Sequence, residues 1–154
     1  MARFNMELPT EIIKDFEKIH GNTEKIFGEM TRAGAEVVAT NVRANAPSGL
    51  ANYVKLSKTY RTPSDGGINT KVYFSGYMPF RDGRTTFTRK GGSGKTYTTN
   101  KGVPADFVAM VFEYGRSGYP FPKKPFFRKS FRGGQIEAAM LKAQKEASGG
   151  LLDE

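Results

Sequence analysis

The sequence predicts an α+β domain, because helical patterns of apolar residues occupy both ends of the chain and strand patterns occupy the middle. Apolar residues recur every three or four positions over residues 8–46 and again over 125–147. Alternating and threonine-rich stretches fill residues 68–114. A length of 154 residues suits one domain with its own core, so we expect a single domain over 1–154.

The first pattern predicts a long N-terminal amphipathic helix, bent or broken near Gly21. Pro9 suits its first turn, and Pro47 ends it. Asn22 can cap a second helical stretch after a break at Gly21. The apolar positions before this break recur at helical spacing and are Ile12, Ile13, Phe16 and Ile19.

The middle of the chain predicts a small, mainly antiparallel β-sheet. Val72 and Phe74 alternate with polar neighbours, as in a half-buried strand. Residues 107–114 are apolar on both faces, which indicates a strand that is either central in the sheet or covered. A C-terminal helix follows over 125–147, opened by a proline and weakened in its middle by two consecutive glycines at about 1 kcal/mol each.

Residues 89–96 read RKGGSGKT and end like the phosphate-binding loop of an ATPase. Such a loop needs a first glycine at the position where this chain has Arg89, and it needs a helix after the lysine. The flanking stretches RTTFT and KTYTT have the composition of strands, and the glycines can provide a reversal between them. The sequence therefore predicts a β-hairpin over 84–99.

The predicted hairpin is basic and projects from the domain. Only Asp82 opposes its six basic residues, which are Arg81, Arg84, Arg89, Lys90, Lys95 and Lys101. A two-stranded ribbon is marginal in water by itself, so we expect it to order against a neighbouring subunit or a polyanion such as DNA. Contact with phosphates would be independent of base sequence and weakened by salt.

Charge is unevenly distributed along the chain, which has a formal net charge of +9. Residues 7–36 contain seven acids and four bases, whereas residues 37–132 contain 17 bases and four acids. The basic middle favours a polyanion or an acidic partner surface. Cysteine is absent, so disulfides and thiolate chemistry are excluded.

The sequence shows no sign of a membrane partner. Its longest uninterrupted apolar run, residues 107–112, is too short to span a bilayer. The N-terminus lacks the apolar core of a secretion signal. We therefore expect a soluble protein made in a cytoplasm.

Catalytic candidates are scarce. His20 is the single histidine in the sequence, lies beside the predicted helix break and has no cysteine to activate. The sequence contains no H-E-x-x-H or G-x-S-x-G motif and no cluster of metal-ligand residues. We predict a protein that is not an enzyme, with no catalytic, cofactor-binding or metal-binding residues.

An aromatic and proline-rich crossover spans residues 112–131. It holds seven aromatic residues and three prolines, and the prolines stiffen the chain. Phe127 and Phe131 can seal the last helix onto the sheet. Tyr119 and Phe121 lie in a predicted loop, where aromatic residues more often mark an interface.

Glu113 raises a question of charge within this crossover. An unpaired carboxylate at the end of an apolar strand would be costly to bury. Arg116 and Arg128 are the candidate partners, within the chain or across a subunit boundary.

The crossover also resembles a known family. The stretch FVAMVFEYGRSGYPFPKKPFFRKSF is similar to the hallmark of the tail-component, or head-to-tail joining, family of long-tailed bacteriophages. That hallmark is an apolar strand ending in E-Y-G, a short loop, and P-x-x-P-F-x-R-x-[AS] opening the last helix. The matching residues are Glu113, Tyr114, Gly115, Ser117, Pro122, Pro125, Phe126, Arg128 and Ser130. The long N-terminal helix running into Ala46-Pro47 resembles the family as well.

The resemblance implies a structural virion protein that completes the tail or joins head to tail at the phage neck. It implies a homo-oligomeric ring around the DNA channel, a hexamer by family resemblance, made in the cytoplasm of a bacterial host. The implied partners are adjacent neck or connector proteins and tail-tube or tail-terminator proteins. We expect the subunit or partner interface to include Glu113, Tyr114, Gly115, Arg116, Tyr119, Phe121, Pro125, Phe126 and Arg128.

Other functions stay open at this stage. The charge also favours a stand-alone basic nucleic-acid-binding module, which would bind DNA as a stable monomer and release it at high salt. A nucleotide hydrolase would require Lys95 to act in a phosphate loop. Within a ring, the basic hairpin could line the lumen and contact DNA, or it could reach into the next ring.

Overall fold

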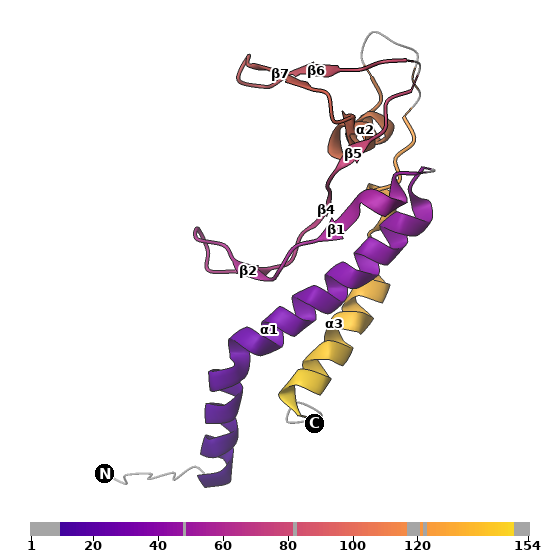
Figure 1. Cartoon of the computed structure of the whole chain (residues 1–154). Helices are drawn as coiled ribbons and strands as arrows, with labels where there is room; N and C mark the ends of the chain where they lie inside the picture. The colour runs from indigo at the N-terminus through magenta and orange to yellow at the C-terminus, as the bar shows by residue number, and fades with distance from the viewer. Residues whose placement is uncertain (1–9, 48, 82, 117–120, 122, 150–154) are drawn as a thin grey trace, which may run out of the picture.

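The computed structural model describes residues 10–47, 49–81, 83–116, 121 and 123–149, and it confirms the predicted α+β class. The helices are α1 (Thr10–Asn45), η1 (Ala51–Tyr53), α2 (Ala105–Tyr114), η2 (Arg128–Ser130) and α3 (Gly133–Ser148). The strands are β1 (Val54–Leu56), β2 (Tyr60–Arg61), β3 (Ile68–Asn69), β4 (Val72–Phe74), β5 (Tyr77–Met78), β6 (Phe87–Lys90), β7 (Thr96–Thr99) and β8 (Val103–Pro104). Figure 1 shows α3 lying beside α1, while the β6–β7 hairpin and α2 lie beyond the C-terminal end of α1.

Helix α1 runs without interruption from Thr10 to Asn45, so the predicted break near Gly21 is wrong. Figure 1 shows that the helix instead changes direction within its N-terminal half, as the bent alternative predicted. One glycine in a helix interior costs only about 1 kcal/mol, which a long helix tolerates. The apolar stripe predicted over residues 12–19 lies outside the described side chains.

Residues 107–114 belong to helix α2, so the predicted central strand is wrong. A short apolar run fits a buried strand and a buried helix equally well by periodicity. The buried residues Ala105, Ala109 and Glu113 recur every fourth position, which only a helix places on one face. Asp106 in the first turn also favours the helix, because its negative charge interacts favourably with the positive end of the helix dipole.

The described strands form four separate antiparallel pairs in place of the single sheet that was predicted. β1 pairs with β4, β2 with β3, β5 with β8, and β6 with β7. The alternation predicted at Val72 and Phe74 is confirmed, since both are half-buried and Tyr73 between them is exposed. Strands this short cannot support an independent sheet, so each pair depends on its neighbours in the fold.

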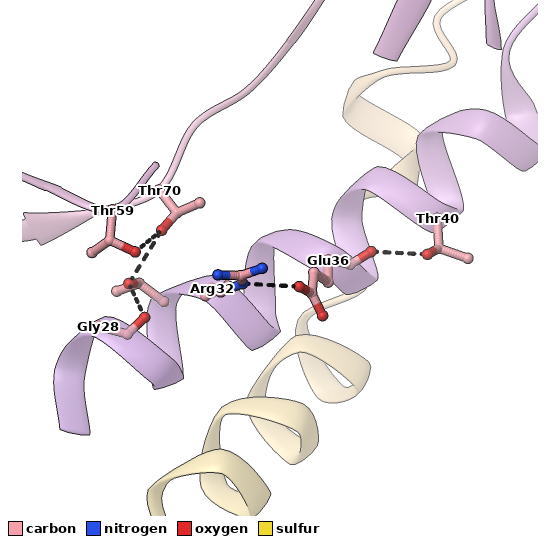
Figure 2. A network of polar contacts seen from close by, with 7 residues as sticks. Gly28, Arg32, Glu36, Thr40, Thr59 and Thr70 are labelled. Atoms are coloured by element: carbon pink, nitrogen blue, oxygen red, sulfur yellow. Dashed lines mark hydrogen bonds and ion pairs between the residues drawn. The ribbon is translucent and has the colours of Figure 1, made fainter. Parts of the chain in front are cut away.

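Threonine hydroxyls attach the β2–β3 pair to the middle of α1 (Figure 2). The Thr70 hydroxyl lies 3.4 Å from the hydroxyl of Thr31 on α1 and 3.2 Å from that of Thr59. The Thr31 hydroxyl also donates to the carbonyl oxygen of Gly28 at 3.1 Å. This bridge helps to hold the strand pair against the helix.

The β-hairpin predicted over 84–99 is confirmed, with β6 and β7 as its arms. At the tip the Gly91 N–H donates to the Lys95 carbonyl oxygen at 2.7 Å. Gly94 has a φ of +78°, a conformation that glycine adopts without strain. Lys95 therefore leads into a strand, and the helix that a phosphate loop requires does not follow it.

Helix α3 begins at Gly133, so the predicted start at Pro125 is wrong. The residues between them form an irregular turn and η2, because the side chain of Glu113 bonds their backbone N–H groups. Gly133 and Gly134 consequently lie in the first turn of α3, and the predicted weakening of the helix middle does not arise.

The hydrophobic core lies where the C-terminal half of α1 meets β1, α2 and the crossover. Its members are Val38, Ala39, Val42, Leu50, Val54, Ala105, Ala109 and Phe126. α3 packs along α1, and Gly34 permits this close approach because a Cβ there would lie 3.1 Å from the Met140 Cγ atom. None of the described helices combines the length and the apolar character needed to cross a bilayer.

Candidate functional site

A buried carboxylate joins the two ends of the crossover. Glu113 is 4% exposed, and its Oε2 atom accepts hydrogen bonds from the backbone N–H groups of Phe126 at 2.9 Å and Phe127 at 3.0 Å. Its Oε1 atom accepts from the Arg128 backbone N–H at 3.3 Å and from the Arg128 Nε at 2.7 Å. We call these four residues the Glu113 clamp. All of the carboxylate's hydrogen bonds in it run to residues 13 to 15 positions away in sequence.

The clamp keeps Glu113 ionised. Burial alone raises the pKa of this carboxyl, but the hydrogen bonds from the Arg128 side chain and from the three backbone N–H groups lower it further than burial raises it. The net result is a pKa below the usual value of 4.5. The carboxylate is therefore a permanent acceptor at neutral pH and has no feature of a proton donor.

The chain returns to α2 through a turn that glycine permits. Gly115 ends α2 with a φ of +80°, and a Cβ at this position would lie 3.2 Å from the Phe121 carbonyl oxygen. Arg116 forms an antiparallel bridge with Phe121, and the Lys124 N–H donates to the Phe112 carbonyl oxygen at 2.9 Å. These contacts lay the crossover back along the helix from which it came.

Ser130 attaches the far end of the crossover to α1. Its side chain is fully buried, and its Oγ donates to the Phe126 carbonyl oxygen at 2.7 Å. The Asn45 Nδ2 donates to the Ser130 Oγ at 3.2 Å, and the Asn41 Nδ2 donates to the Ser130 carbonyl oxygen at 3.2 Å. The crossover is thus bonded to α2 at one end and to α1 at the other.

We expect Ser130→Ala to lower the free energy of unfolding by about 2 kcal/mol, because it leaves buried polar partners without their hydrogen bonds. Urea denaturation followed by circular dichroism measures this difference. Ser93→Ala, at the exposed tip of the hairpin, is the matched control and should change the value by less than about 0.5 kcal/mol. Equal stability of the two variants would contradict the role given to Ser130.

The structure divides the described residues of the predicted interface into three groups. Glu113 and Phe126 are buried, so they support the fold and do not form the predicted interface directly. Gly115 and Pro125 are half-buried. The exposed members are Tyr114, Arg116, Phe121 and Arg128, and Tyr119 lies outside the described residues.

Two exposed aromatic rings are held in place by neighbours within the crossover. The Arg128 guanidinium lies 5.4 Å from the centre of the Tyr114 ring, and Tyr114 is 60% exposed. Phe121 packs edge-on against Phe112 at a ring distance of 5.3 Å. Both rings expose apolar area to solvent. Because they are already ordered, a partner that bound them would lose little side-chain entropy.

The predicted basic residues surround the hairpin and its base. The five exposed members are Arg81, Arg84, Lys90, Lys95 and Lys101. Arg89 is half-buried and pairs with Asp106 on α2 at 3.5 Å. Phe87 also packs on Phe107 of α2 at a ring distance of 5.0 Å. The hairpin is therefore fixed to α2 at its base, while most of its positive charge faces solvent.

The structure also has an apolar surface, separate from the basic hairpin, that was not predicted from the sequence. One groove of about 260 Å³ lies between β4 and α2, and another of about 410 Å³ lies between α1, α3 and β4. Val72 and Phe127 line both grooves, so the two lie side by side. We call this surface the apolar band and define it by Val72, Tyr73, Met110, Tyr114, Phe127 and Phe131.

The apolar band escaped prediction because residues 107–114 were assigned to a strand. In a strand, Met110 and Tyr114 would share one face with Val108 and Phe112. In a helix, Met110 and Tyr114 share a face because they are four residues apart. The spacing of four between Met110 and Tyr114 was the sequence signal for this surface. It indicates an exposed apolar face only once the opposite face of α2 is known to be buried in the core.

The described residues offer few candidates for reaction chemistry. His20 is exposed on α1. Within the described residues, no three side chains of histidine, cysteine, aspartate or glutamate are grouped so that they could hold a metal ion. The expectation that the protein is not an enzyme stays a prediction.

Comparison of the chain with models of known protein families, with curated proteins and with solved structures finds no match. The likeness of the crossover to the phage family therefore stays a prediction from the sequence motif.

Proposed function

We propose that this chain is a structural subunit of the neck or tail-completion ring of a long-tailed phage. The observation that supports this most is the Glu113 clamp. The residues that match the family motif at the end of α2 and those that match it before α3 are bonded to one another. The two parts of the motif therefore form one bonded unit. If the likeness to the family were accidental, there would be no reason for its two parts to contact each other.

The clamp suits a protein whose work is assembly. It fixes the residues before α3 to the end of α2 without any reactive group, and Tyr114 and Phe121 nearby are exposed where a neighbouring subunit could reach them. Interface energy concentrates in such pre-ordered aromatic residues. The hairpin projects separately and carries positive charge toward a second neighbour or toward DNA (Figure 1).

The mass of the purified full-length chain tests this proposal. We expect light scattering or native mass spectrometry to show a defined oligomer, either with the chain alone or after addition of phage tail tubes. The resemblance gives six as the expected number of subunits. A chain that stays monomeric under both conditions would contradict the proposal.

A basic nucleic-acid-binding module is the second candidate, because the hairpin exposes cations with few acids nearby. We expect the chain to bind duplex DNA without sequence preference, and Lys90→Ala with Lys95→Ala to reduce the slope of log affinity against log salt by about 2. The double variant Lys14→Ala with Lys25→Ala, exposed on α1, is the matched control and should leave the slope unchanged.

Fluorescence anisotropy with labelled DNA at several salt concentrations measures both slopes. A tight, salt-sensitive complex of a stable monomer would favour this second candidate over the ring. A slope that both variants leave unchanged would show that the hairpin does not contact phosphate, and it would leave the ring proposal standing.

A further inference from the structure

We propose that the crossover is a second phosphate-binding surface, adjoining the basic hairpin, so that both segments contact one nucleic acid duplex. The inference rests on the nucleic-acid contact proposed for the hairpin. It extends that contact to a segment for which the sequence predicted a subunit interface. Two observations support it, the unneutralised positive charge of the crossover and the junction that the two segments share at Phe112.

Positive charge is concentrated at one end of the fold. Residues 77–131, from β5 through the crossover, contain eleven bases and three acids. The two acids that the structure describes there are both engaged by arginines. Asp106 pairs with Arg89 at 3.5 Å, and Glu113 pairs with Arg128 at 2.7 Å. These pairs neutralise two of the bases and leave nine.

The nine remaining bases are all exposed and fall into two groups. The hairpin group is Arg81, Arg84, Lys90, Lys95 and Lys101, and the crossover group is Arg116, Lys123, Lys124 and Lys129. Within the described part of the chain, the three lysines of the crossover group form no ion pair. The third acid of this region, Asp82, lies outside the described residues and next to the hairpin group in sequence. The crossover group therefore has no described acid to neutralise its lysines.

The two groups meet at Phe112 on α2. Arg81 and Arg84 line a pocket of about 300 Å³ together with Phe112. The Phe112 ring also packs against Phe121 of the crossover at a ring distance of 5.3 Å. Its carbonyl oxygen accepts from the Lys124 N–H at 2.9 Å. The base of the hairpin and the crossover thus adjoin one another at this residue, although they are far apart in sequence.

Both groups are fixed to α2 before a partner binds. Phe87 of the hairpin packs on Phe107, and the Glu113 clamp holds the crossover to the other end of the helix. Phe107 and Glu113 are six residues apart, or about 9 Å along the helix axis at 1.5 Å per residue. A duplex carries one negative charge per about 1.7 Å of its axis, so both groups can reach phosphates of the same duplex. Because the supports are already ordered, binding orders little besides the cationic side chains.

The composition of the surface favours a nucleic acid over an acidic protein. Six of the nine exposed bases are lysine, which is depleted at interfaces between proteins. Interfaces with nucleic acid are much more positively charged than interfaces between proteins. Counterion release supplies most of the energy of phosphate contact. The crossover group therefore fits a phosphate backbone, which it would contact without regard to base sequence.

The salt dependence of DNA binding tests the inference. The crossover variant carries Lys124→Ala with Lys129→Ala, and the hairpin variant carries Lys90→Ala with Lys95→Ala. We expect fluorescence anisotropy with a labelled duplex to show that each variant reduces the slope of log affinity against log salt by about 2, because each phosphate contact contributes about one. The four substitutions together should reduce the slope by about 4.

Lysines on α1 provide the matched controls, because Lys14 and Lys25 are exposed in the N-terminal half of that helix. Lys14→Ala with Lys25→Ala should leave the slope unchanged. Protection of a thiol is a second measurement that keeps the hairpin intact. The chain has no cysteine, so Lys124→Cys introduces a single thiol. We expect duplex DNA to slow its alkylation by a maleimide several-fold and to leave the alkylation of Lys25→Cys unchanged.

The outcomes separate this inference from the functions proposed above. A crossover variant with the slope of the parent chain, together with an unprotected Lys124→Cys thiol, would overturn the inference, and a reduced slope in the hairpin variant would leave the hairpin contact standing. A crossover variant that changes the oligomer mass and not the slope would assign the crossover to a subunit interface, which also overturns the inference. A parent chain that binds no duplex at low salt would overturn the inference and the second candidate function together, and it would leave the ring proposal intact.

Discussion

Replacing Glu113 with alanine will lower the free energy of unfolding by about 3 kcal/mol, the largest loss that we expect from any single polar side chain, because buried backbone donors lose their acceptor. The substitution removes the acceptor for three backbone N–H groups and for the Arg128 Nε. The N–H of Phe126 is buried, so no water replaces the lost bond there. Urea denaturation measures the loss.

Glu137→Ala is the matched control for this substitution, because Glu137 is exposed on α3. Its effect should stay within about 0.5 kcal/mol. A Glu113→Ala variant that is as stable as this control would contradict the clamp as a stabilising unit.

The contribution of Glu113 to stability will disappear in acid. Its pKa in the folded chain lies below the usual 4.5, so the folded state favours the charged form more than the unfolded state does. The contribution is therefore complete above the unfolded pKa and is lost as the pH falls through the folded pKa. The difference in unfolding free energy between the parent chain and Glu113→Gln should be constant near neutral pH and should shrink below pH 4.5. A difference that does not change with pH would contradict an ionised Glu113.

Replacing Gly102 with alanine will destabilise the chain by about 3 kcal/mol through its backbone. Gly102 has a φ of +130°, which side chains rarely allow, and a Cβ there would overlap the Met78 carbonyl oxygen. Because Met78 pairs with Val103 in β5–β8, the added methyl group would force these strands apart. α2 begins directly after β8, so its position over the core would be disturbed as well.

Thermal unfolding compares this variant with Gly92→Ala. Gly92 lies in the exposed hairpin tip, has no heavy atom within 4 Å of an added Cβ and does not have a positive φ. Its substitution should be neutral or slightly stabilising, because alanine restricts the unfolded chain. Equal melting temperatures of the two variants would show that Gly102 has room to relax.

Local patterns predicted the hairpin and the long first helix correctly. The hairpin follows from two threonine-rich arms around glycines, and each part of that signal lies within a few residues of the others. The six bases around it could likewise be named from the sequence, although the partial burial of Arg89 against Asp106 could not. The first helix was predicted to be bent or broken near Gly21, and the structure selects the continuous, bent alternative.

The candidate site could be predicted only in part. Glu113 and its need for a partner followed from the cost of burying a charge, and the structure selects Arg128 from the two candidates. The three backbone donors could not be foreseen, because they depend on the path by which the crossover returns to α2. The apolar band could not be foreseen either, because it combines residues from three parts of the chain, β4, α2 and the segment before α3.

The sequence by itself determined the order of charge along the chain, the helices at its two ends and the basic hairpin between them. Only the tertiary structure decided that residues 107–114 are helical, that Glu113 is buried and that exposed aromatic residues join into one band. The physical reason is the range of the interactions. Turn chemistry and helical spacing act between neighbours in sequence, whereas burial and the satisfaction of buried polar groups depend on segments that meet only in the folded chain.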